Sequence, residues 1–154
     1  MSMKTVPIGA ALAVAITGFL VGVIFTEMLV ARQTIQSGGH LETAGVCVFW
    51  EETCTNNVSS IDWGSLEVGA TKEATVYISN DGGTPVTLNM TTDNWSPALA
   101  SYYIELSWNR EDYVLKSGSV AKTVLTLAVA PSVQGFTEFD FDIIISGIEA
   151  SSSI

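Results

Sequence analysis

Histidine, cysteine and basic residues are scarce in this chain of 154 residues. It has one histidine, two cysteines and six lysines and arginines, against sixteen aspartates and glutamates. A single histidine excludes a blue-copper site, which needs two histidines and a cysteine, and leaves too few ligands for a zinc site. No Ser-His-Asp or Cys-His arrangement is persuasive either, because His40 lies in a glycine-rich segment expected to be an exposed linker. The sequence therefore predicts a protein that is not an enzyme, with no metal and no cofactor.

The shortage of positive charge also limits the partners of the chain. The formal net charge is −10, yet only 14% of the residues are charged and the acidic ones are dispersed. This pattern is typical of a solvated acidic surface rather than a disordered acidic tail. It excludes nucleic acid and anionic lipid as partners, since both are negatively charged.

Charge is missing altogether from Val6 to Thr26, a run of twenty-one residues. A membrane-spanning helix needs about 20 apolar residues, so the run predicts a single N-terminal hydrophobic helix. A cleaved signal peptide is the alternative, but signal cores are usually shorter and the nearest cleavage site, ending at Ala31, has the bulky Leu29 where a small residue is needed. Lys4 precedes the run, and positive charge next to a membrane helix favours the inner side of the membrane. The chain is therefore expected to cross the cell membrane once, with its N-terminus inside the cell and its domain extracellular. If the segment is removed, the protein is secreted.

The composition divides the chain into four parts. Gly38 and Gly39 lie in a stretch that lacks both the helical and the strand periodicity, which predicts a linker. An alternative for this stretch is a strand added to the sheet of a neighbouring molecule. The expected parts are a membrane anchor or uncleaved signal helix at 1–31, a linker or stalk at 32–44, a β-sandwich domain at 45–148 and a flexible tail at 149–154.

Short segments with alternating apolar and polar residues follow the linker, with turn signals between them. The expected strands are 46–50, 58–63, 73–79, 85–91, 102–108, 121–129 and 137–146. In the last of them Phe139, Phe141, Ile143 and Ile145 share one face. Segments of this length and spacing predict an all-β chain, an immunoglobulin-like β-sandwich of about seven strands preceded by the N-terminal hydrophobic helix.

The segment from Ile61 to Leu88 contains an ordered series of turn and strand signals. The series comprises Asp62-Trp63-Gly64, Gly69, a strand at Val76 to Ile78, and a turn at Asn80 to Pro85. It resembles the opening half of Hydin-type and major-sperm-protein-like immunoglobulin domains, which implies the same β-sandwich fold. The membrane segment departs from those usually cytosolic domains, so their partners are not carried over. A looser likeness, to archaeal exported cell-surface proteins and camelysin/TasA-type fibre proteins, implies a structural role.

The two cysteines, Cys47 and Cys54, enclose six residues within a segment that reads as strand, turn and strand. In an exported domain, a pair this close in sequence predicts a disulfide. Because the enclosed loop is small, the stabilisation should fall at the low end of about 2–4 kcal/mol.

Three N-x-S/T sequons begin at Asn57, Asn89 and Asn94. All three are expected at turns or on water-facing strand positions, where N-glycosylation of an exported protein takes place. Coincidence in a chain rich in serine and threonine is the alternative.

Two further features bear on binding. Trp50 lies beside two glutamates at the expected loop tip and is a candidate contact for a glycan or partner, whereas Trp63, Trp95 and Trp108 are expected in the core. Glu138, Asp140 and Asp142 share one strand face and could bind Ca²⁺, although such a row more often protects an edge strand from unwanted pairing.

These features predict a non-enzymatic cell-surface structural protein that displays an extracellular β-sandwich on a membrane anchor, for envelope organisation or adhesion. A self-assembling extracellular filament subunit that donates a strand to its neighbour is one alternative. A surface module that binds glycan or peptide is the other. The expected partners are therefore the membrane, further copies of the chain, and glycans.

Overall fold

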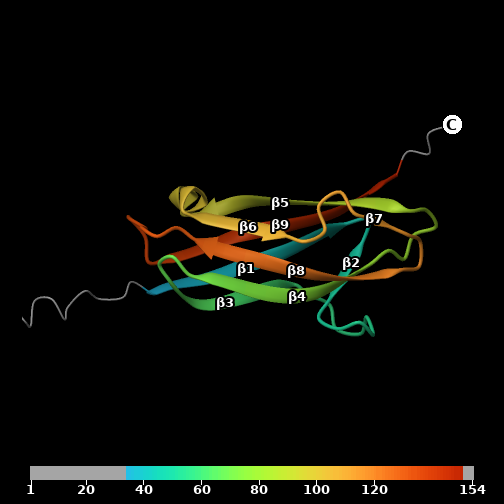
Figure 1. Cartoon of the computed structure of the whole chain (residues 1–154), viewed down its shortest axis with the longest axis horizontal. Coiled ribbons are helices and arrows are strands. Elements are labelled where there is room, and N and C mark those ends of the chain that lie inside the picture. Colours follow the sequence, from blue (N-terminus) through green and yellow to red (C-terminus); the bar gives the residue numbers. More distant parts are fainter. Residues whose placement is uncertain (1–33, 151–154) are drawn as a thin grey trace, which may run out of the picture. The chain divides into compact units, whose positions relative to one another are not determined.

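The computed structural model describes residues 34–150, and this part of the chain is almost entirely β-structure. Strands make up 60% of the described residues and helix 4%, and the strands form two sheets. The prediction of an all-β sandwich is therefore confirmed (Figure 1).

The first sheet, here called sheet A, has five strands and the second, sheet B, has four. The order in sheet A is β3 (Ser60–Glu67), β1 (Thr34–Ala44), β9 (Glu138–Glu149), β5 (Val86–Ser96) and β7 (Val114–Leu115). The order in sheet B is β2 (Cys47–Phe49), β4 (Thr71–Ser79), β8 (Val120–Val129) and β6 (Ile104–Trp108). A short 3-10 helix, η1 (Ala98–Tyr102), leads from β5 in sheet A to β6 in sheet B. All neighbouring strands are antiparallel except β1 and β9, which run parallel.

The core lies between the sheets and follows from the period-two alternation of the strands. In β9 the four apolar residues Phe139, Phe141, Ile143 and Ile145 are buried while Glu138 and Asp140 are exposed, as the sequence predicts. The central strands of sheet B bury Val76 and Ile78 from β4 and Leu125 and Leu127 from β8. One continuous cluster of buried side chains therefore joins the two sheets.

The tryptophans expected in the core contribute to it to different degrees. Trp63 is almost fully buried, whereas Trp95 and Trp108 are half-buried and pack against the core from its margin. The Trp95 ring stacks on Phe141 with ring centroids 4.2 Å apart. The expectation of core positions is therefore confirmed for Trp63 and holds at the core boundary for the other two.

The linker predicted at 32–44 is wrong for its described part, because residues 34–44 form strand β1 inside sheet A. β1 pairs with β3 on one side and with β9 on the other. Its alternation is hidden in the sequence because the inward positions are Ser37, Gly39 and Leu41, only one of which is strongly apolar. A Cβ at Gly39 would lie 3.1 Å from Ile143 Cδ1 and 3.3 Å from Trp63 Nε1, so the glycine leaves room for its larger neighbours.

Several other expected boundaries also change. The described residues contain nine strands rather than about seven, because β1 and the two-residue β7 were not expected. The sandwich begins at Thr34 instead of residue 45, and β9 continues to Glu149, the first residue of the expected tail. His40 is an exposed strand residue of β1 and does not lie in a linker.

The predicted N-terminal hydrophobic helix, residues 1–31, lies outside the described residues, as do residues 151–154. Within 34–150, no helix combines the length and the apolar character that crossing a bilayer requires.

Candidate functional site

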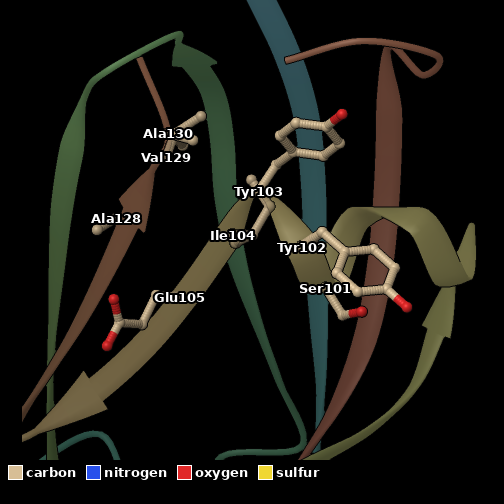
Figure 2. A pocket seen from close by; sticks show the side chains of 8 residues that line it. All are labelled: Ser101, Tyr102, Tyr103, Ile104, Glu105, Ala128, Val129 and Ala130. Carbon is tan, nitrogen blue, oxygen red and sulfur yellow. The ribbon is translucent and has the colours of Figure 1, made fainter. Parts of the chain in front are cut away.

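A hollow of about 410 Å³ lies at the end of sheet B where β6 begins and β8 ends. Its walls come from three elements: the end of η1, the first residues of β6 and the last residues of β8. The lining residues are Ser101, Tyr102, Tyr103, Ile104, Glu105, Ala128, Val129 and Ala130. Figure 2 shows the rings of Tyr102 and Tyr103 at the start of β6 and the Glu105 carboxylate further along the strand.

Tyr102 is the most exposed of the large hydrophobic side chains in the described part of the chain, with 83% of its surface open to solvent. Its position follows from η1, whose single turn is closed by a hydrogen bond from Ala100 N to Pro97 O at 2.9 Å. Ala100 is fully buried and anchors the turn in the core. The turn thus directs the Tyr102 ring into solvent, although strand alternation predicts it on the inward face with Ile104.

Tyr103 forms a fixed wall of the same hollow. Its ring contacts Phe136 in a tilted arrangement with centroids 6.0 Å apart, and its carbonyl oxygen accepts a hydrogen bond from Ala130 N at 2.8 Å. The hollow therefore combines one tyrosine held by the fold with one that is free to contact a ligand.

Among the described residues that line the hollow, Glu105 alone is charged. It lies opposite Ala128 in the β6–β8 register, so a methyl group is its cross-strand neighbour. Among the described residues its carboxylate has neither a hydrogen-bond donor nor a cation as a partner. The two oxygens can therefore accept hydrogen bonds from a bound molecule.

The acidic row of β9 is arranged differently from a calcium site. Asp142 Oδ2 accepts a hydrogen bond from Asn94 Nδ2 at 2.6 Å, and Asp140 Oδ1 lies over Gly38, 2.7 Å from where a Cβ would be. Within residues 34–150, no three His, Cys, Asp or Glu side chains converge closely enough to hold a metal ion. β9 is also an interior strand of sheet A, so the row does not protect a sheet edge.

Both cysteines are free thiols in the structure, so the disulfide predicted between Cys47 and Cys54 is absent from it. Main-chain hydrogen bonds hold the loop instead, from Trp50 N to Asn56 O and from Val58 N to Val48 O, both at 2.9 Å. Cys47 is exposed at the start of β2.

Cys54 is half-buried in that loop, with its thiol 3.5 Å from the carbonyl oxygen of Glu52. Burial raises the pKa of the Cys54 thiol, and the nearby groups Asp81, Cys47 and Glu52 raise it further because a thiolate would be repelled by negative charge.

The three sequon asparagines lie at different places on the molecule. Asn57 is exposed and forms an isolated bridge with Phe49, and Asn94 is exposed with a positive φ of 50°. Asn89 is half-buried in β5, opposite Ser146 of β9. Each can be reached from solvent to some extent, and N-glycosylation stays a prediction.

Trp50 is 38% exposed at the end of β2, which is compatible with the predicted contact role. The hollow at Tyr102 was not predicted from the sequence, because the expected strand 102–108 includes this residue. The signal that marks the turn is Pro97-Ala98-Leu99-Ala100, a proline followed by good helix formers. The predicted site residues Trp50, Cys47 and the sequons are not among the residues that line the hollow.

No protein-family model matches the chain, and no curated protein matches it either. The resemblance to Hydin-type and major-sperm-protein-like domains consequently stays a prediction.

Proposed function

We propose that the protein is a non-enzymatic structural component of the cell surface, whose β-sandwich is displayed outside the membrane by the N-terminal segment. The observation that carries this proposal is the uncharged run from Val6 to Thr26, which is long enough to form a membrane-spanning helix. The uncharged run ends at Thr26 and β1 begins at Thr34, so only the residues between them connect the two. The acidic surface of the sandwich would limit its contact with anionic lipid headgroups.

The exposed thiol of Cys47 gives a direct test of this placement. Intact cells are treated with a membrane-impermeant phosphine and then with an impermeant maleimide. Labelling of the full-length chain without cell lysis is expected, and the Cys47→Ser variant should lose most of the label because Cys54 is half-buried. Labelling that requires lysis would contradict an extracellular domain. Sequencing the N-terminus of the native protein then separates the anchored form, which begins at or near Met1, from a secreted form that begins near residue 32.

We also infer that the sandwich is immunoglobulin-like and related to the Hydin-type class. The local geometry supports this inference at the residues of the resemblance. Gly64 and Gly69 have φ of 64° and 77°, and Asp62 Oδ1 accepts a hydrogen bond from Gly64 N at 2.7 Å. The Asn80 side chain holds the following turn by accepting a hydrogen bond from Gly82 N at 3.0 Å. A crystal structure that lacks the parallel β1–β9 pair, or the strand order β2-β4-β8-β6 in sheet B, would remove this inference.

A second candidate function is assembly of copies of the chain by exchange of β1. This strand lies between β3 and β9, so its removal would leave β3 without a neighbour in sheet A and would expose one edge of β9. It is also the first described strand, and can leave its own sheet without unthreading any other element. Exchange between copies would rebuild the same sheet with a neighbour's β1, which is the arrangement of strand addition and domain swapping.

Engineered disulfides in the β1–β9 register can detect this exchange. His40 lies opposite Asp142, and neighbouring strands are close enough for a disulfide. Chains with His40→Cys are mixed with chains carrying Asp142→Cys, and both native cysteines are replaced by serine. Exchange predicts oxidised heterodimers that also appear in filaments by electron microscopy.

In the matched control, the second chain carries Ile148→Cys instead of Asp142→Cys. Ile148 is exposed, but it is not paired with His40 in the β1–β9 register. Uniform monomers without the mixed disulfide would exclude exchange while leaving surface display untouched.

A further inference from the structure

We propose that the hollow beside β6 binds a neutral saccharide, with Tyr102 as the stacking surface and Glu105 as the main hydrogen-bond acceptor. This inference goes beyond a structural role and does not depend on the N-terminal segment, since the residues that line the hollow lie in or directly beside η1, β6 and β8 (Figure 2).

The first observation is the exposure of Tyr102. An aromatic ring that is 83% exposed contributes little to the core, so the fold itself gives no reason for its size. Aromatic faces carry partial negative charge and attract the weakly positive C–H groups of a sugar ring. The neighbouring Tyr103 is held against Phe136, so the binding surface has one rigid and one adaptable ring.

The second observation is the kind of polar groups in the hollow. Ser101 Oγ already donates to Ala98 O at 2.8 Å, and the Glu105 carboxylate has no donor among the described residues, so both groups mainly offer lone pairs. They therefore suit a ligand that presents several hydroxyl donors.

The negative charge of the site favours neutral ligands over anionic ones. Of the described lining residues Glu105 alone is charged, and the chain has a net charge of −10, so an anionic sugar or a phosphate would be repelled. A hollow of about 410 Å³ lies within the range of small-ligand sites, and its open form suits a short saccharide better than an enclosed apolar ligand.

A peptide strand added to the edge of β6 is the main competing ligand, and the backbone disfavours it at this place. Tyr103 has φ of −117° and ψ of −14°, which is not an extended conformation. A peptide paired with β6 could extend only over Ile104–Trp108 and would end before the Tyr102 ring.

The test is isothermal calorimetry with the full-length chain in micelles of a detergent without a sugar headgroup. Maltotriose, cellotriose, laminaritriose and mannotriose are the neutral probes, and sialyllactose is the anionic one. At least one neutral trisaccharide should bind at millimolar or lower concentration, and sialyllactose should not. Tyr102→Ala should raise Kd about tenfold, equivalent to about 1.4 kcal/mol, and Glu105→Gln should weaken binding less.

Tyr113→Ala is the matched control, because Tyr113 is also exposed (40%) but does not line the hollow. It should leave Kd unchanged. Tyr102→Ala should leave the unfolding midpoint unchanged, which separates lost binding from lost folding. Absence of heat with all four neutral probes, or equal loss of affinity in Tyr113→Ala and Tyr102→Ala, would overturn the proposal.

Discussion

Gly45 shows how single residues set the geometry of this fold. Its φ of 72° lies in the left-handed region, and a Cβ would come within 2.7 Å of the backbone oxygen of Gly147. The residue links β1 to β2, and therefore carries the chain from sheet A to sheet B. Gly118 has a similar φ of 70° but no atom within 4 Å of its missing Cβ. A side chain at Gly118 would therefore meet only the strain of a positive φ, whereas a side chain at Gly45 would also collide with the backbone.

We expect Gly45→Ala to destabilise the domain by about 2–4 kcal/mol, because it adds a backbone clash to the left-handed strain. Gly118→Ala should lower the free energy of unfolding by only about 1 kcal/mol. Urea unfolding followed by tryptophan fluorescence measures both. Equal losses for the two variants would show that the approach to Gly147 is relieved by a small backbone movement.

Cys54 offers a pH-dependent prediction at the same scale. Its thiol pKa is raised above the ordinary 9.0, first by burial and then by Asp81, so the protonated thiol dominates at neutral pH. The proton is bound more tightly in the folded state, so the associated stability is present at neutral pH and is lost as pH rises through the thiol pKa.

In the Cys47→Ser background, alkylation of Cys54 by iodoacetamide should be slow at pH 8 and accelerate above pH 9. Asp81→Asn should increase the rate at pH 8 by about twofold, since it removes one repulsive charge. Glu73→Gln, which is not among the groups that raise this pKa, is the control. A rate unaffected by Asp81→Asn would assign the shift to burial alone.

At the scale of elements, the turn between β4 and β5 depends on Asn80, a fully buried amide. Its Nδ2 donates to the carbonyl oxygens of Thr84 at 2.8 Å and Leu115 at 3.1 Å, and its Oδ1 accepts from Gly82 N at 3.0 Å. The side chain thereby fixes its own turn and ties that turn to β7. The sequence pattern predicts the turn but contains no signal for the contact with Leu115, which is 35 residues away.

Asn80→Ala should destabilise the protein by about 2–4 kcal/mol, because buried groups are left without partners. Asn80→Asp should be at least as costly, since a carboxylate cannot donate to the two carbonyl oxygens. Asn109→Ala is the control: its exposed side chain accepts one hydrogen bond, from Val124 N at 3.0 Å, and its loss should cost less than about 1 kcal/mol. Thermal unfolding of the three variants tests this order.

The strands differ in how well the sequence predicts them. The alternation in β9 is strong because its inward residues are all large and apolar, so this strand and its buried face are predictable. β1 is not, because its buried positions include Ser37 and Gly39, and at Gly39 the neighbours Ile143 and Trp63 already fill the space. The hollow at Tyr102 was missed for a different reason, since the single turn of η1 that begins after Pro97 interrupts the alternation. Local patterns fail where a residue is chosen to fit neighbours that are distant in the sequence.

For the whole molecule, the dominant property is the excess of negative charge. The net charge is −10 at pH 7 and the isoelectric point is about 4.2. Copies of the chain therefore repel one another at neutral pH and low salt, and any assembly has to overcome this repulsion.

Self-association should consequently increase as the pH is lowered towards 4.2 and as salt is added at pH 7. Light scattering of the full-length chain in detergent micelles, with empty micelles as the reference, measures this. Association that weakens with added salt would instead indicate attraction between opposite charges. In that case the dispersed acidic surface would not be the barrier to assembly.

The parallel pairing of β1 and β9 has a mechanical consequence. Nine residue pairs join the strands, from Gln36 with Glu138 to Ala44 with Ser146, and the outer ends at Thr34 and Glu149 lie at opposite ends of the pair (Figure 1). Tension applied between residues 34 and 150 loads these hydrogen bonds in shear, all at once. Tension between residues 34 and 138 would open them one by one, like a zipper. Single-molecule pulling should therefore require a higher unfolding force in the first geometry than in the second. A sandwich held at residue 34 and pulled at residue 150 is thus loaded in the direction in which the β1–β9 pair is hardest to separate.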